Sequence, residues 1–501
     1  IYFPKFFHPD PTVKRQSGFL MPQVIDSSSL GLSFKLPYYK VISDNKDLTF
    51  TPRIFSENEA LFQNEYRQVN KNSKHIVDFS LKEKNSTSKT HFFSNSLTKL
   101  NMDIFDISEI ELNLETTSDE NYLKTHNIKS KINTNQSLLK SFLIFRGSSR
   151  DMDLETKIEA YEDLTVDKSS DQYEYIFPSY KFSKRLPSNF NGNYEIISSG
   201  NYKNYDTNIF EKVLINDLKF SSNPKIISTG FVNKFSVLLK NITSEADNST
   251  NYKNKFSSEN FGSIFYDMSY PLKKEGNYFD SFLTAKGSLM YSPNSNKDLK
   301  TLDRKIDINN IFTQNRLSLE DAVEGGQSLT LGGEYSLKGK ESGSDIIKAG
   351  LATVLRDNEE TNLPTKSTLN NKGSDFIGSL IFEPNKNFKF DYNFSIDSDF
   401  ESSNYNSVKT DISVNKFVTS FEFLQEDDEV GSESFLSNET SYNFNDSYSL
   451  KYRTRRNKKT DFTEFYNLIY EYKNDCLTAS IQYNKDYYSD NELKPTEELF
   501  F

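Results

Sequence analysis

Residues that could carry out catalysis or hold a metal are few in this chain and poorly spaced for either task. The histidines are His8, His75, His91 and His126. None of them has the spacing that places two imidazoles on one helix face to bind zinc. The segment 147–151 comes closest to a nucleophile elbow, but its closing glycine is missing. The glycine pairs at 325–326 and 332–333 lie in alternating sequence rather than in phosphate loops. We therefore expect no enzymatic activity, no cofactor and no bound metal.

Cys476 is the one cysteine of the chain, so a disulfide within the chain is excluded. It follows a strand-like segment and precedes another apolar stretch. It could pair with a cysteine in a part of the protein outside this sequence, or it could remain a free thiol.

Pro22 and Pro37 are the residues with the clearest mechanical consequence. Pro22 ends an irregular, proline-rich connector (9–22), and Pro37 falls in the next amphipathic segment. Proline has no N–H to donate to a strand ladder, so it belongs at sheet edges or strand starts. From the residues alone, the two prolines either weaken pairing between the first two strands or merely end strands beside turns.

The chain whose elements must position these residues has an amino-acid composition that is unusual for a soluble protein. Of 501 residues, 35% are hydrophobic, yet 14% are aromatic, with Phe 42, Tyr 29 and no Trp. Soluble domains are closer to half apolar, and disordered chains are depleted in aromatics. A transmembrane β-barrel accounts for both values, because only one side of each strand meets lipid and aromatic girdles mark the interfaces. Tyr and Phe would form those girdles.

Two further features narrow the class of protein. No run approaches the ~18 apolar residues of a membrane helix, so a membrane-spanning chain of this sequence would have to be a closed barrel. The net charge of −11 argues against a nucleic-acid partner. The chain begins with Ile1 rather than Met. We therefore expect a piece of a longer protein, in which the lack of a signal peptide says nothing about compartment.

Strict alternation of apolar and polar residues is the main structural signal. In 388–397 every even position is apolar and every odd position is polar, and similar alternation occurs in 77–82, 109–115, 329–338 and 417–423. Residues two apart in a strand share a face, so each segment has one apolar side and one polar side. Turn-rich pieces such as 292–297 and 383–387 separate the segments, and longer polar stretches occur at 241–254 and 356–373. Short turns at one end and long loops at the other are typical of bacterial barrels, and the length leaves room for more than about 20 strands.

Widely spread segments of the chain resemble the LptD family of lipopolysaccharide-assembly proteins. These segments are Phe3-Pro4, His8-Pro9-Asp10-Pro11, Ser17-Gly18-Phe19-Leu20-Met21-Pro22, Leu36-Pro37-Tyr38-Tyr39, Asp47-Leu48-Thr49-Phe50-Thr51-Pro52, Glu65-Tyr66-Arg67, Ser118-Asp119-Glu120-Asn121-Tyr122-Leu123, Tyr175-Ile176-Phe177-Pro178, Tyr466-Asn467-Leu468-Ile469-Tyr470-Glu471-Tyr472 and Cys476. No single segment is specific, but together they keep the family's order along essentially the whole chain.

The resemblance implies an all-β fold: a large antiparallel transmembrane β-barrel of about 26 strands, within the range of bacterial barrels. Residues 1–17 would be the end of a periplasmic jelly-roll and its connector, and 18–501 the barrel, with the family continuing into a further strand-like stretch. Pro22 and Pro37 match two prolines near a lateral gate between the first and last strands. Cys476 matches a place where the family forms disulfides to the N-terminal domain, although the family has two cysteines there.

The function implied is non-enzymatic transport of lipopolysaccharide into the outer leaflet of the Gram-negative outer membrane. The implied partners are lipopolysaccharide, the plug lipoprotein LptE, the periplasmic bridge protein LptA through the N-terminal domain, and outer-membrane lipids. Two alternatives stay open. One is a diffusion porin or a TonB-dependent receptor barrel, although a receptor would carry a globular plug before the first strand. The other is a secreted β-sandwich or adhesin, which would not need detergent for extraction.

Overall fold

The computed structural model describes residues 15–28, 30–56, 59–84, 87–166, 170–188, 190–206, 208–473, 478–487 and 496–500. Nearly all regular structure in these ranges is antiparallel β-sheet. The helical pieces are α1 (Tyr122–Thr125) and three 3-10 turns, η1 (Ser170–Gln172), η2 (Thr365–Ser367) and η3 (Asp428–Val430). Within this part of the chain, no helix is long and apolar enough to cross a membrane.

The first half of the chain contributes strands β1 to β16. They are β1 (Gly18–Phe19), β2 (Gln23–Ser27), β3 (Gly31–Lys35), β4 (Tyr38–Ser43), β5 (Lys46–Phe55), β6 (Ala60–Val69), β7 (Ser73–Lys84), β8 (Thr87–Leu100), β9 (Ile107–Thr117), β10 (Leu138–Ser148), β11 (Met152–Asp163), β12 (Tyr173–Leu186), β13 (Gly192–Tyr205), β14 (Ile209–Ser222), β15 (Lys225–Ile226) and β16 (Val232–Asp247).

The second half contributes strands β17 to β29. They are β17 (Ser257–Glu275), β18 (Phe279–Ser292), β19 (Gly326–Gly339), β20 (Asp345–Arg356), β21 (Phe376–Asn385), β22 (Phe388–Ile396), β23 (Ser403–Val414), β24 (Phe417–Glu426), β25 (Ser434–Asn443), β26 (Tyr448–Asn457), β27 (Phe462–Lys473), β28 (Thr478–Asp486) and β29 (Thr496–Phe500).

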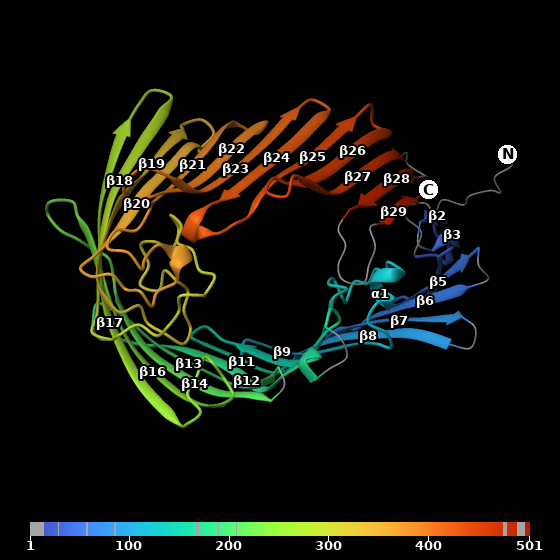
Figure 1. Ribbon diagram of the computed structural model, residues 1–501, viewed down its shortest axis with the longest axis horizontal. Helices are drawn as coiled ribbons and strands as arrows, with labels where there is room; N and C mark the ends of the chain where they lie inside the picture. The colour runs from blue at the N-terminus through green and yellow to red at the C-terminus, as the bar shows by residue number, and fades with distance from the viewer. Residues whose placement is uncertain are drawn as a thin grey trace.

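The strand pairings of the described residues run in a ring (Figure 1). From β5 each strand pairs with the next along the chain, and β29 pairs with β2, which returns through β3 to β5. Of the 29 labelled strands, β1 and β4 continue the interrupted strands that contain β2 and β3, and β15 lies beside the path because β14 pairs directly with β16, which leaves 26 strands in the ring. The predicted fold class, a large antiparallel barrel, is confirmed, and the single sheet differs from the two stacked layers of a sandwich.

Apolar side chains lie on the outside of this ring and polar ones on the inside, the reverse of a soluble protein. On β7, Phe79 and Leu81 are 42% and 41% exposed, while the alternate residues Asp78 and Ser80 are 1% and 2% exposed. The same alternation holds on β19, where Leu329 and Leu331 alternate with the buried Ser328 and Thr330. An outward apolar band around a polar lumen is the pattern of a barrel in a membrane.

The two ends of the ring differ as the sequence predicted. One end, the turn end, has short connections such as 44–45, 70–72 and 386–387. The other, the loop end, has the long connections 118–137, 293–325 and 357–375. Strands of one barrel alternate in direction, so successive connections fall at opposite ends, and here the long ones fall at the loop end.

Two expected connections have different bounds in the structure. The polar stretch 241–254 is half strand, because β16 continues to Asp247 before a connection at 248–256. Its outward side chains there are polar, Asn241 bonding to Asn260 and Ser258, because the strand extends beyond the apolar band. The expected short turn at 292–297 is instead the beginning of the long connection 293–325.

Candidate functional site: interrupted strands and the lumen behind them

Pro22 and Pro37 each interrupt one of the first two barrel strands. Pro22 lies between β1 and β2, and Pro37 lies between β3 and β4. β1 pairs with β4 and β2 pairs with β3, so the two breaks lie side by side. β3 and β4 keep one register along β5, which makes them two pieces of a single interrupted strand. The structure therefore brings the two predicted site residues together at one level of the wall.

Hydrogen bonds across these breaks run in one direction only. The Leu20 N–H donates to the Pro37 carbonyl at 2.8 Å, and the Leu36 N–H donates to the Pro52 carbonyl at 3.1 Å. In an antiparallel ladder such residues normally exchange two bonds. Proline has no N–H for the return bond, so each pair has one bond where two are usual.

Pro52 is a functional candidate that the sequence analysis missed. It lies inside β5, opposite Phe62 on the other side, and extends the row of prolines to a third strand. The available signal was spacing: Pro22, Pro37 and Pro52 follow one another at equal intervals of 15 residues. The register places the three prolines at nearly the same height, because Gln23 opposes Lys35 and Lys35 opposes Arg53.

The ring closes beside this row. β29 joins β2 through three register pairs, Ile25 with Phe500, Asp26 with Leu499 and Ser27 with Glu498. All three lie at the loop-end side of Pro22. Near the turn end, Arg15 forms an ion pair with Asp47, which also binds Arg67 at 2.6 Å.

Residues 118–137, here called the lumen segment, pack against the inner face of the first strands. Arg53 donates to the His126 carbonyl at 2.9 Å, and Gln63 donates to the Lys129 carbonyl at 3.0 Å. Burial among Lys82 and Arg53 lowers the pKa of His126 to about 3. Tyr122, which is fully buried, shares a hydrogen bond of 2.7 Å with Ser80, and burial raises its pKa to about 12.

Behind Tyr122 lies a chain of groups that has the composition of a catalytic triad. Ser80 Oγ lies 2.6 Å from His91 Nδ1, and His91 Nε2 lies 3.2 Å from Asp78 Oδ1. All three side chains are buried, and Ser80 is also hydrogen-bonded to the buried Tyr122 hydroxyl. A nucleophile needs an accessible reacting position beside it. In this arrangement the three groups anchor the lumen segment to the wall.

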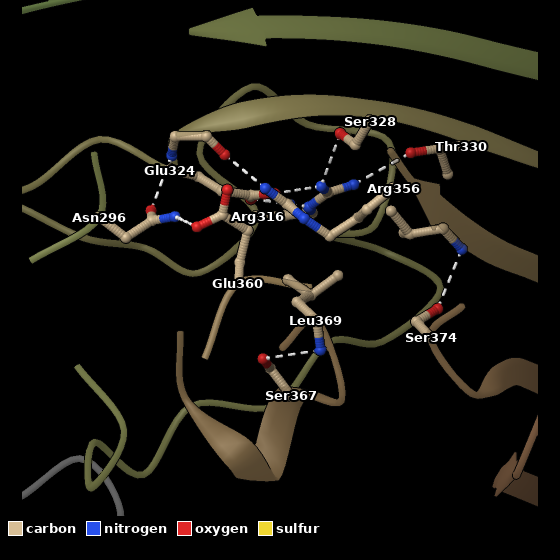
Figure 2. A network of polar contacts seen from close by, with 12 residues as sticks. Asn296, Arg316, Glu324, Ser328, Thr330, Arg356, Glu360, Ser367, Leu369 and Ser374 are labelled. Atoms are coloured by element: carbon tan, nitrogen blue, oxygen red, sulfur yellow. Dashed lines mark hydrogen bonds and ion pairs between the residues drawn. The ribbon is translucent and has the colours of Figure 1, made fainter. Parts of the chain in front are cut away.

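A second buried network holds the loop-end connections 293–325 and 357–375, here called the lumen loops (Figures 1 and 2). Arg316 donates to Glu324 Oε2 at 2.9 Å and to Thr330 at 3.0 Å, and Arg356 forms an ion pair with the same carboxylate. Burial disfavours the ionised form of Glu324, but attraction and hydrogen bonds from the two arginines outweigh it and lower its pKa. The lumen loops are thereby tied to the inner face of β19 and β20.

An apolar cluster lies under these loops. Its buried members are Leu299, Ile306, Ile311, Leu317, Leu319, Ala322, Ala352, Val354, Leu363, Leu369 and Ile377. Most come from the loops themselves and the rest from inward positions of β20 and β21. The long connections are thus folded structures inside the ring outline, not extended chains (Figure 1).

Cys476 and His8 lie outside the described residues. Within the described ranges, no group of three or more His, Cys, Asp or Glu side chains is placed to hold a metal ion. His75 bonds to Ser96 and Ser73 at 2.9 Å each, and His91 bonds to Ser80 and Asp78.

Comparison with known proteins agrees with the sequence resemblance. The family model of LptD, LPS transport system D, matches residues 91–434. The LPS-assembly protein LptD of Acinetobacter baylyi is 22% identical over 372 residues, covering 68% of this chain and 43% of that protein. LptD of Yersinia enterocolitica is 46% identical over 56 residues, 11% of this chain and 7% of that protein. The chain thus spans less than half the length of these relatives.

Solved structures are less similar. The FrpB iron transporter of Neisseria meningitidis aligns over 97% of this chain and 81% of its own, with a TM-score of 0.35 and 7% identity, which is too low to support an argument. The family model, by contrast, matches more than half of the sequence, including the strands on both sides of the lumen loops. The chain therefore belongs to the LptD family, LPS transport system D.

Proposed function

We propose that this protein transports lipopolysaccharide and inserts it into the outer leaflet of the Gram-negative outer membrane through a lateral gate between its first and last strands. The outward apolar band supports a location in that membrane as an integral β-barrel. The row of interrupted strands beside the junction of β29 and β2 is the observation that carries the proposal.

The physical reason is the cost of opening a barrel wall. Every strand of a closed barrel is hydrogen-bonded on both sides. An amphipathic lipid can leave sideways only where two neighbouring strands of that wall separate at a modest cost in free energy. One ladder hydrogen bond contributes about 0.5–1.5 kcal/mol net, so the return bonds that Pro37 and Pro52 cannot make change the open population substantially. Pro22 breaks the first strand at the same height.

The partners follow from family membership and remain part of the proposal. Residues 1–17 end a periplasmic jelly-roll and connector, through which the bridge protein LptA delivers lipopolysaccharide, and 18–501 form the barrel. LptE fills the lumen. The lumen segment and the lumen loops pack on the wall in two separate clusters, and LptE would occupy the interior between them. We assign no catalytic step to the chain, because its triad-like serine is buried under Tyr122.

Cys476 has a proposed role in joining the barrel to the N-terminal domain by a disulfide. In the sequence it falls between β27 (Phe462–Lys473) and β28 (Thr478–Asp486). A Cys476→Ser variant of the full-length protein should lose a mobility difference between reduced and non-reduced gels. An unchanged difference would assign that disulfide to other cysteines.

Depletion of the protein tests the transport function. Surface lipopolysaccharide should fall on depletion and recover when the wild-type gene is restored, whereas unaltered surface lipopolysaccharide would contradict the proposal. Planar-bilayer conductance separates the first alternative, since a diffusion porin would show a stable open pore. The receptor and the secreted sandwich are not favoured by the family match.

A further inference from the structure

A cavity of about 520 Å³ lies between the inner face of the first strands, the lumen segment and strands β27 and β28. Pro22 and Ile25 line it on the first strand, Leu61 on β6 and Ile128 on the lumen segment. It therefore has an apolar side that reaches the interrupted strands. Its polar side is formed by Lys35, Arg53, Gln63 and Lys129.

The charges of this cavity are all of one sign. Lys35, Arg53 and Lys129 contribute three cations, and no aspartate or glutamate is among the described residues that line it. The chain as a whole carries 71 acidic and 60 basic residues. A cationic cavity in an acidic protein is therefore a local feature rather than a consequence of composition.

The three cations differ in how they are held. Arg53 is buried and fixed, with Nε donating to Ser33 Oγ at 3.0 Å and Nη1 donating to the His126 carbonyl at 2.9 Å. Lys35 is partly buried on β3, and Lys129 is exposed on the lumen segment. In the part of the chain that the structure describes, neither lysine ammonium group has a hydrogen-bond or ion-pair partner.

Asp78, which bonds to the lining residue Gln63, is already engaged by neighbouring side chains. Asp78 accepts two hydrogen bonds from Gln63, at 3.1 and 3.2 Å, and lies 3.2 Å from His91. Arg53 is buried and Lys35 is partly buried, and like charges withdrawn from water are costly unless an opposite charge joins them. Guanidinium and ammonium groups bind phosphate through charge-assisted hydrogen bonds. An anion bound in this cavity would neutralise its three cations.

We propose that Lys35, Arg53 and Lys129 bind a phosphate of an amphiphilic glycolipid, while its hydrocarbon part lies along Pro22, Ile25 and Leu61. This proposal rests on the proposed function and adds to it a specific recognition site. The phosphorylated headgroup is held in the lumen, and the hydrocarbon lies beside the first strands, which separate from the last strand when the lateral gate opens. Free inorganic phosphate would satisfy the same cations but would not use the apolar side.

Native mass spectrometry of the full-length protein released from detergent micelles tests this site. The probes are diphosphorylated lipid A, dephosphorylated lipid A and inorganic phosphate. The double variant Lys35→Gln/Lys129→Gln removes the two unpaired charges and leaves Arg53 in place. Lys451→Gln, at a lysine of β26 that does not line the cavity, is the matched control. A heat-dependent gel shift verifies that each variant forms a barrel.

We expect the double variant to bind diphosphorylated lipid A about tenfold more weakly, the lower end for losing hydrogen bonds to a charged group. Its binding of dephosphorylated lipid A should not change, and Lys451→Gln should bind like the wild type. Wild-type affinity in the double variant would overturn the site. Inorganic phosphate binding as tightly as the lipid would overturn the amphiphile assignment. Either result leaves the transport function standing, since depletion and surface lipopolysaccharide test it separately.

Discussion

Replacing Pro37 and Pro52 by alanine should tighten the wall and slow lipopolysaccharide delivery. In the structure Leu20 and Leu36 each donate one hydrogen bond to a proline carbonyl and receive none in return. Alanine would supply the missing N–H at both positions without changing strand register. The account requires the first two strands to bend outward at these breaks when β2 leaves β29, so the two added ladder bonds would be present only in the closed state.

The size of the effect follows from the number of bonds. Two net bonds of about 0.5–1.5 kcal/mol each favour the closed wall by about 1–3 kcal/mol. That free energy lowers the open population by about five- to 150-fold. If opening limits delivery, the rate falls by the same factor. Each single variant should give about half of this free energy.

A pulse-chase measurement of newly made lipopolysaccharide at the cell surface provides the rate. The control is Pro271→Ala in β17, a proline that pairs with Thr284 far along the ring from the junction. The reasoning is refuted if the double variant, present in the membrane at normal level, delivers at the wild-type rate. It is equally refuted if Pro271→Ala slows delivery as much.

Three other changes test the lumen structures. Glu324→Gln leaves two buried arginines without their anion and should destabilise the lumen loops by about 3–5 kcal/mol, seen as faster protease cleavage within 293–325. Acid should loosen the lumen segment. The pKa of His126 is lowered to about 3 in the folded state. Just below about pH 6.5, therefore, His126 binds a proton only when the lumen segment has left the wall. The stability that neutral His126 contributes is therefore complete above that pH and declines as pH falls toward 3. Protease sensitivity of 118–137 should accordingly rise between pH 7.5 and 5. The rise should be smaller in the His126→Gln variant. Tyr122→Phe removes a buried hydroxyl and leaves Ser80 with one partner fewer, which should cost about 1–2 kcal/mol in hydrogen-exchange protection of the same segment.

The barrel itself was predictable because a membrane imposes a simple rule on each strand. Alternate residues meet lipid or lumen, so 77–82 and 329–338 show period two in the sequence, and exposure alternates in the structure over 78–82 and 328–331. Pro22 and Pro37 were identifiable because proline has a fixed consequence in any ladder. Pro52 was missed because its surroundings give a continuous strand, and only its equal spacing sets it apart.

The lumen structures could not be predicted in the same way. Residues 118–137 and 293–325 are polar and lack periodicity, so their docking depends on which inward side chains the ring places opposite them. Tyr122 meets Ser80, and Arg316 meets Thr330, only because register brings those strand positions to the same depth. The basic cavity likewise joins β3, β5 and the lumen segment, which are separated in sequence.

A disulfide across the junction tests the lateral gate most directly. Asp26 and Leu499 are register partners on β2 and β29, and Cβ atoms of opposed residues lie about 4.5–5.5 Å apart, close to what a disulfide spans. The Asp26→Cys/Leu499→Cys variant should stop delivering lipopolysaccharide when oxidised and resume on reduction, while either single variant, keeping Cys476, delivers normally. Unimpaired delivery by fully cross-linked protein would contradict a gate at this junction.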